Sequence, residues 1–246
     1  MTKPPVDLSV IVPVYNEENR IGVSLIKILT YLDSLHLNYE VVIVDDGSPD
    51  NTLSVIEEIR RNNPVISVYK YNQNRGKGYA VRYGLQKGRG KVRLFTDADL
   101  STPIEELERF LKWMDEGYDV CIASRAVPES NITLHQTMHR EMLGKIFNKI
   151  IRLFLFLPFS DTQCGFKCFT GAFVDQMMPL MTVNRFGFDS ELLFVANKSG
   201  YSIKELGTQW ENSPETKVSL FADPIKMLGA IPKIYYNLLS GHYNLE

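Results

Sequence analysis

Val92-Arg93-Leu94-Phe95-Thr96-Asp97-Ala98-Asp99-Leu100 is the stretch that decides the fold of this chain. Arg93 apart, its first five residues are typical of a buried strand, and Asp97 and Asp99 follow at the carboxyl end. Alternate side chains of extended backbone point the same way, so both carboxylates can face one pocket. In an open parallel sheet, such a pocket lies beyond the carboxyl ends of the strands.

Two interpretations of this acidic pair stay open at this point. Two like charges in one pocket repel each other unless a cation neutralises them, and Mg²⁺ usually binds one or two carboxylates together with substrate phosphates. The alternative is a strand followed by a helix start, with Asp99 or Ser101 as N-cap and Pro103 at the first helical position. That alternative does not explain why a buried strand should end in two acids.

Strand-like and helical segments alternate outward from this stretch. Strands are expected at residues 7–14, 40–44, 65–71, 92–96 and 118–123. Helices are expected to end near residues 35, 61 and 87, and a further helix covers 103–116. This alternation predicts an α/β fold with a mainly parallel central sheet and helices on both faces. Polar clusters at the strand ends, Tyr15 to Glu17, Asp45-Asp46, Asp97 to Asp99 and Ser124-Arg125, would then share one edge.

The pattern changes after Arg125. A long amphipathic helix is expected over 138–159, a helix over 190–199, a strand over 201–206 and a final helical region over 223–239 that Pro232 divides. The sequence contains neither an internal repeat nor a low-complexity linker. We therefore predict a catalytic unit over residues 1–217 and a C-terminal amphipathic helical region over 218–246.

Composition limits the function classes. The chain has 246 residues, 44% of them hydrophobic and 23% charged, with a net charge of −2, which predicts a folded protein with a sizeable core. Nucleic-acid binding is not expected, because it usually requires a strong basic excess. No signal peptide and no run of 18 apolar residues is found, so a transmembrane helix is not expected. The three cysteines are expected to be reduced and buried.

Two further clusters carry recognisable chemistry. Asp45-Asp46-Gly47-Ser48 could hold ribose hydroxyls or a ring N–H of a base, or it could simply cap a helix. Arg75-Gly76-Lys77-Gly78 puts two cations and backbone N–H groups at a helix start, which favours phosphate, although a solvated basic turn is the alternative. It does not fit the Walker pattern. With the acidic pair, these clusters describe a site for a metal-bound nucleoside diphosphate.

Four ordered motifs together resemble family 2 glycosyltransferases, which have the GT-A nucleotide-sugar-binding fold. They are Pro13-Val14-Tyr15-Asn16-Glu17-Glu18, Val44 to Ser48, Asn74 to Ala80, and Thr96 to Asp99. Later segments resemble the polyprenyl-phosphate branch, nearest to dolichyl-phosphate β-glucosyltransferases and next to dolichyl-phosphate mannose synthases. These segments are Ser124-Arg125, Asp161 to Lys167, and Arg185 to Leu193. The resemblance covers about residues 7–217.

The resemblance implies roles for individual residues. Asp99 would be the main ligand of Mg²⁺ or Mn²⁺, with Asp97 beside it. Arg125 and Arg140 would grip the acceptor phosphate, and Asp189 and Glu191 occupy the place of an acidic acceptor-side motif. The nucleotide-sugar contacts would be Pro13, Tyr15, Glu17, Asp46, Arg75, Lys77, Asp97, Gln163, Lys167 and Lys217. The chain departs from the family pattern just before Lys217, where Asn212-Ser213-Pro214 replaces a short turn bearing glycine or serine.

The expected reaction is inverting transfer of a hexose to a polyprenyl or dolichyl phosphate. The donor would be UDP-glucose, with GDP-mannose as the alternative. An ionised phosphate acceptor needs cations but no strong base, whereas a saccharide hydroxyl would need Asp189 or Glu191 as general base. A soluble family 2 transferase acting on such a hydroxyl is therefore the rival enzyme, and a non-catalytic nucleotide- or lipid-binding module is the rival from another class.

A basic amphipathic helix over Met138 to Phe159 has the composition of an interfacial helix, and Ile225 to Tyr243 is similar. We therefore expect a peripheral protein on the cytoplasmic face of a membrane. The alternative is that both segments pack on the sheet or on a second subunit, in a soluble cytoplasmic protein.

Overall fold

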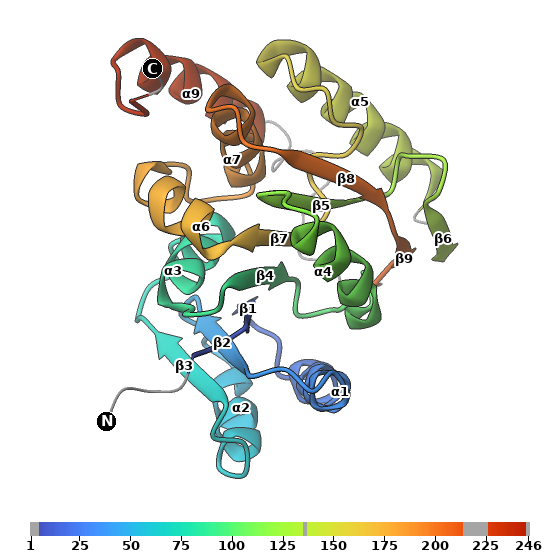
Figure 1. Cartoon of the computed structure of the whole chain (residues 1–246), viewed down its shortest axis with the longest axis vertical. Coiled ribbons are helices and arrows are strands. Elements are labelled where there is room, and N and C mark those ends of the chain that lie inside the picture. The colour runs from blue at the N-terminus through green and yellow to red at the C-terminus, as the bar shows by residue number, and fades with distance from the viewer. Residues whose placement is uncertain (1–4, 135–136, 214–225, 245–246) are drawn as a thin grey trace.

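A seven-stranded sheet forms the centre of the computed structural model, which describes residues 5–134, 137–213 and 226–244 (Figure 1). Its strand order is β3-β2-β1-β4-β7-β5-β8. The strands are β1 (Leu8–Val14), β2 (Tyr39–Asp45), β3 (Ile66–Lys70), β4 (Val92–Thr96), β5 (Val120–Ser124), β7 (Phe166–Thr170) and β8 (Ile203–Gly207). Neighbouring strands are parallel except at β7, which is antiparallel to both β4 and β5. The predicted α/β fold with a mainly parallel sheet is confirmed.

The β7 strand was not expected from the sequence. It lies between the two strands that the alternation would have made neighbours, and it is buried on both faces. Lys167 is the second residue of this five-residue strand, so neither a continuous apolar run nor a polar–apolar alternation marks it. A second sheet of β6 (Asn131–Leu134) and β9 (Gln209–Glu211) was also not expected.

Helices cover both faces of the sheet, as predicted (Figure 1). Alternate β1 residues belong to different cores: Val10 and Val12 pack with α1 (Ile21–Ser34), α2 (Thr52–Arg60) and α4 (Leu107–Asp115), which a 3₁₀ turn (Ile104–Glu106) precedes. Ile11 faces the other core, which contains side chains of α3 (Lys77–Lys87), α5 (Met138–Leu155), α6 (Gly171–Met177), α7 (Phe188–Lys198) and α9 (Ala230–Leu239). Another 3₁₀ turn (Met178–Leu180) follows α6. This division follows from the two-residue period of a strand.

The amphipathic helix predicted from residue 138 is α5, and it ends at Leu155 rather than 159 because Phe156 adopts a left-handed conformation. Its buried residues Phe147, Ile151 and Leu155 join the core. No helix in the described parts of the chain combines the length and apolarity needed to cross a membrane. The prediction that Pro232 divides the final helical region is wrong, because the helix is interrupted at Gly229 instead. Pro232 lies in the first turn of α9, where its missing N–H is tolerated. All three cysteines are free and buried, as expected.

Candidate active site

A cavity of about 1620 Å³ lies beyond the carboxyl ends of the strands. Most of the site residues predicted from the sequence line it: Pro13, Tyr15, Glu17, Asp46, Lys77, Asp97, Asp99, Arg125, Gln163 and Asp189. Arg75, Lys167 and Glu191 are not among its lining residues. Lys217 and the side chain of Arg140 lie outside what the structure describes. Segments far apart in sequence therefore meet at the sheet edge that the polar clusters predicted.

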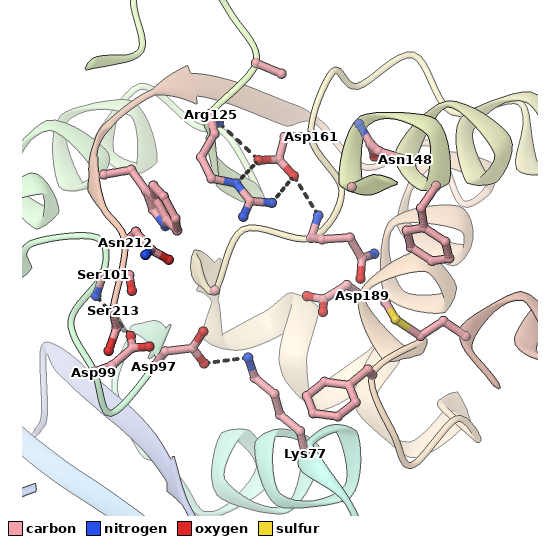
Figure 2. A pocket seen from close by; sticks show the side chains of 18 of the residues that line it. Lys77, Asp97, Asp99, Ser101, Arg125, Asn148, Asp161, Asp189, Asn212 and Ser213 are labelled. Carbon is pink, nitrogen blue, oxygen red and sulfur yellow. Dashed lines mark hydrogen bonds and ion pairs between the residues drawn. The ribbon is translucent and has the colours of Figure 1, made fainter. Parts of the chain in front are cut away.

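The acidic pair after β4 faces this cavity (Figure 2). Lys77 Nζ lies 2.6 Å from Asp97 Oδ1, and burial, which alone would lower the pKa of Lys77, is outweighed by Asp97 and Asp189, which raise it. Asp99 Oδ1 accepts the N–H of Ser101 at 3.0 Å, and Asp99 Oδ2 lies 3.9 Å from Arg20 Nη1. Lys77 therefore balances the charge of Asp97, whereas Arg20, the ion-pair partner of Asp99 among the described residues, is too distant from it for a hydrogen bond.

The backbone beside Asp97 leaves no room for another side chain. Asp97 N donates to the carbonyl of Gly165 at 3.1 Å. A Cβ added at Gly165 would lie 1.9 Å from Asp97 Oδ2. Only glycine allows this close approach, so Gly165 positions the carboxylate that Lys77 binds. In the sequence, Gly165 is only one member of the motif Asp161 to Lys167, and no local signal predicts this role.

The side chains of the site can supply only some of the ligands of a metal ion. They fit a metal whose remaining ligands come from a bound substrate, and not one that the protein surrounds. The described residues contain no group of three or more His, Cys, Asp or Glu side chains placed to hold a metal. Asp97 and Asp99 can supply carboxylate oxygens from one side of the cavity, and Mg²⁺ ordinarily completes its shell with phosphate oxygens and water. Because Lys77 is already paired with Asp97, Asp99 is the better ligand of the two.

The helix start at Gly76 is not the phosphate cradle that the sequence suggested. The N–H groups of Arg75 and Gly76 donate to Asp46 at 2.7 and 2.9 Å, and Asn74 Nδ2 donates to the same carboxylate at 2.9 Å. The N–H of Tyr79 donates to the carbonyl of Asn184 at 2.9 Å. Protein acceptors thus occupy several donors that phosphate would need.

The glycines of this turn serve packing. A Cβ at Gly76 would meet the carbonyl of Asn184 at 2.6 Å, and one at Gly78 would meet Phe188 Cβ at 2.5 Å. Arg75 is exposed and places its guanidinium 4.6 Å from the ring centroid of Tyr79, outside the cavity lining. The side chain stacks on its own helix and does not face the cavity, so this arrangement does not support the expected contact with the base or diphosphate. Of the two cations of this motif, Lys77 alone lines the cavity.

A second ion pair joins the half-buried Arg125, directly after β5, to the buried Asp161. Arg125 Nε lies 2.6 Å from Asp161 Oδ2 and Arg125 Nη2 lies 3.0 Å from Oδ1. Burial alone would raise the pKa of Asp161, but Arg125 lowers it to about 2. In turn, Glu205 accepts the N–H groups of Ser160 and Asp161, both at 2.8 Å. The sequence predicts no role for Asp161 beyond its place at the start of a motif. Its role depends on the contact with Arg125, which is distant in the sequence.

The two acids of α7 have different surroundings. Asp189 lines the cavity and accepts from Lys167 Nζ at 2.5 Å. Glu191 is fully buried, and its carboxylate accepts from Thr182 N, Val183 N and the Tyr243 hydroxyl at 2.7–3.0 Å. Glu191 is therefore held in the core and does not fit the expected catalytic role. Lys167 lies behind Asp189 and does not line the sugar side itself.

Comparisons with known proteins agree with this geometry. The family model described as "Glycosyl transferase family 2" matches residues 9–177. The chain belongs to this family. The dolichyl-phosphate beta-glucosyltransferase of Drosophila melanogaster is 34% identical to this glycosyltransferase over 257 residues, covering 98% of this chain and 78% of that protein. The enzyme of the same name from Saccharomyces cerevisiae is 33% identical, covering 96% and 76% of the two chains.

Solved structures extend the agreement to the fold of this family 2 glycosyltransferase. The mannosyl-3-phosphoglycerate synthase of Rubrobacter xylanophilus matches with a TM-score of 0.67 at 18% identity, covering 98% of this chain and 76% of that one. At that identity the match shows the fold alone, and it agrees with the predicted GT-A architecture.

Proposed function

We propose that this family 2 glycosyltransferase transfers glucose from UDP-glucose to a polyprenyl or dolichyl phosphate, with inversion at the sugar carbon. The observation that carries the proposal is the division of one cavity into two halves. One half contains the carboxylates Asp97 and Asp99 with Lys77, and the other contains Arg125 and the cations of α5. The names of the relatives that span nearly the whole chain support glucose as the transferred sugar and dolichyl phosphate as the acceptor.

The donor half suits a nucleoside diphosphate. Negative charge develops on the leaving diphosphate as the sugar–phosphate bond breaks, and positive groups fixed nearby stabilise that charge. Lys77 is such a group, and Asp99 would hold Mg²⁺ or Mn²⁺ with Asp97 beside it. When bound, the metal supplies Lewis-acid stabilisation of the diphosphate. Pro13, Tyr15 and Glu17 form the wall where the nucleoside would lie.

The acceptor half suits a phosphate monoester. Arg125 is oriented by Asp161, yet its Nη1 has no hydrogen-bond partner among the described residues (Figure 2). Lys145, Lys149 and Arg152 of α5 also line the cavity. A guanidinium matches phosphate oxygens well, and an ionised phosphate attacks without a general base. The acceptor role of Arg140 remains part of this proposal on the family resemblance alone.

A membrane surface would present such an acceptor. The α5 helix exposes Met138, Met142, Ile146, Leu153 and Phe154, and Phe156 follows with 77% exposure. The α9 helix is adjacent, since the Tyr235 hydroxyl donates to the carbonyl of Phe154, and it exposes Tyr236 and Leu239. Apolar side chains beside lysines and arginines are typical of a helix that lies in the lipid interface. These features support the proposal that the protein is peripheral on a membrane, and we take its side to be the cytoplasmic face, as the family resemblance implies.

Donor turnover tests the proposal. A panel of UDP- and GDP-sugars, with GDP-mannose as the main alternative donor, would be incubated with Mn²⁺ or Mg²⁺, with and without a short polyprenyl phosphate. We expect release of UDP from UDP-glucose that depends on the lipid phosphate. Asp99→Asn should abolish transfer, whereas Asp115→Asn, at the exposed end of α4, should not.

Other results would favour the rivals. If nucleotide release requires a saccharide, the acceptor group is a hydroxyl and not a lipid phosphate, and Asp189 becomes the candidate general base. Unchanged turnover in Asp99→Asn would contradict the proposed donor site. A protein that binds nucleotide sugar but transfers nothing would fit a binding module.

A further inference from the structure

Asp189 and Lys167 form a buried ion pair in the wall of the cavity. Lys167 lies in the centre of the sheet, opposite Phe95 of β4 and Ile122 of β5, and its side chain is fully buried. Its Nζ donates to Asp189 Oδ1 at 2.5 Å and to the carbonyl of Cys164 at 2.6 Å. A lysine in this position is rare unless its charge is compensated, so Asp189 is held as its counterion.

The other oxygen of Asp189 faces the cavity. Asp189 lies in the first turn of α7, where the helix dipole favours an anion. Its Oδ2 has no donor among the residues that the structure describes. In Figure 2, Lys77 lies between Asp97 and Asp189, and both carboxylates raise the pKa of Lys77. Asp189 is thus an oriented acceptor one step beyond the position proposed for the diphosphate.

We propose that Asp189 accepts a hydrogen bond from a hydroxyl of the donor sugar and that Lys167 is the residue that positions it. This inference rests on the proposed function. A sugar attached to a diphosphate that lies against Lys77 extends away from Asp97 and Asp99, toward Asp189 and Gln163. The carboxylate would repel a phosphate but would accept from a hydroxyl.

The same geometry disfavours Asp189 as a general base. A base must take up a proton in the transition state. Protonation of Asp189 would leave the ammonium of Lys167 buried without a counterion, which is strongly unfavourable. A fixed anion that only accepts a hydrogen bond keeps the pair neutral throughout the reaction. The pair therefore fits recognition of the sugar better than activation of an acceptor hydroxyl.

Calorimetric titration separates the sugar contact from the nucleotide contact. UDP-glucose and UDP would each be titrated, with Mn²⁺ present, into the wild type, Asp189→Asn and the control Asp115→Asn. We expect Asp189→Asn to weaken UDP-glucose by about 10- to 100-fold, the usual effect of losing a hydrogen bond to a charged group, and to leave UDP unchanged. The control variant should bind both as the wild type does.

Donors lacking a single hydroxyl identify the contact. One monodeoxy analogue of UDP-glucose should bind the wild type as weakly as UDP-glucose binds Asp189→Asn. The affinity of this analogue should be the same for Asp189→Asn as for the wild type. Lys167→Met should reproduce the loss for UDP-glucose while sparing UDP. Either single variant leaves one charge of the pair buried alone. If one of them fails to fold, the double variant Lys167→Met with Asp189→Asn removes both charges, and it should show the same loss for UDP-glucose as Asp189→Asn with UDP spared.

The outcomes are distinguishable. Wild-type protein that binds neither UDP nor UDP-glucose would refute the proposed donor and this inference with it. Normal UDP-glucose affinity in Asp189→Asn, with transfer alone lost, would make Asp189 a catalytic group and overturn only the sugar contact. Equal weakening of UDP and UDP-glucose would also overturn it, since the effect would then not depend on the sugar.

Discussion

Replacing Gly165 by alanine tests how tightly the acidic pair is positioned. The new Cβ would lie 1.9 Å from Asp97 Oδ2 and 2.5 Å from Asp97 Cγ, whereas real contacts stay above 3.0 Å. The carboxylate must therefore retreat by more than about 1 Å, and its 2.6 Å contact with Lys77 will break. A misplacement of about 1 Å in an active site can reduce the rate about 100-fold. We expect a loss of that order in sugar transfer.

The assay compares kcat/KM for the donor with thermal unfolding of the same samples. Alanine adds no left-handed strain at Gly165, because its φ lies outside the positive range. The melting temperature should therefore change little while activity falls. Gly22→Ala in α1 is the matched control, since its Cβ meets only flexible side chains of α2, the nearest at 3.3 Å. Wild-type activity in Gly165→Ala would refute the positioning role of this glycine.

Three further substitutions test other parts of the structure. Tyr243→Phe removes a buried hydrogen bond of 2.7 Å and should lower the free energy of unfolding by about 1–3 kcal/mol in urea titrations, whereas Tyr236→Phe, at a 72% exposed position, should not. The pKa of Asp161 falls from 3.8 to about 2 on folding, so its stabilisation is complete above pH 4 and is lost as the pH falls through 2. Between pH 5 and 2, the free energy of unfolding of the wild type should fall by about 2 kcal/mol more than that of Asp161→Asn. An equal fall in both proteins would contradict the assigned ion pair. Phe156→Glu should reduce flotation with anionic liposomes about tenfold or more, whereas Ile26→Glu on α1 should not, and equal flotation of both variants would contradict the proposed membrane face.

Local patterns were sufficient to predict the frame of the site. The alternation within a strand, the end of a strand and the acids after β4 are each visible within a few consecutive residues. A short stretch of sequence is therefore enough to predict each of them. Asp97 and Asp99 accordingly line the cavity as predicted. The β7 strand shows where this reasoning fails. Its burial depends on two strands that are distant in sequence, and the charge of its lysine, Lys167, is compensated by an acid 22 residues away.

Roles that depend on distant partners could not be predicted in this way. The turn at Gly76 has the composition of a phosphate-binding loop, but several of its donors are occupied by Asp46 and by the carbonyl of Asn184. Glu191 belongs to an acidic motif, yet the hydroxyl of Tyr243, 52 residues away, helps to hold it in the core. In both cases the residue types were correct for the expected chemistry, and tertiary contacts decided whether the groups were available.

The charges that line the cavity provide a last argument on donor and acceptor. Near β1, β2, α3, β4 and α7, acids outnumber cations among the described residues: Glu17, Asp46, Asp97, Asp99 and Asp189 against Arg20, Lys77 and Arg185. Around β5 and α5 the balance is reversed: Arg125, Lys145, Lys149 and Arg152 against Glu141 and Asp161. On the proposed function, a bare diphosphate would be repelled by the first half, so we expect it to bind together with a divalent cation. A phosphate monoester would be attracted to the second half without one. A neutral saccharide acceptor would gain little from this basic half. The division of charge therefore favours a metal-bound nucleotide sugar as donor and a lipid phosphate as acceptor.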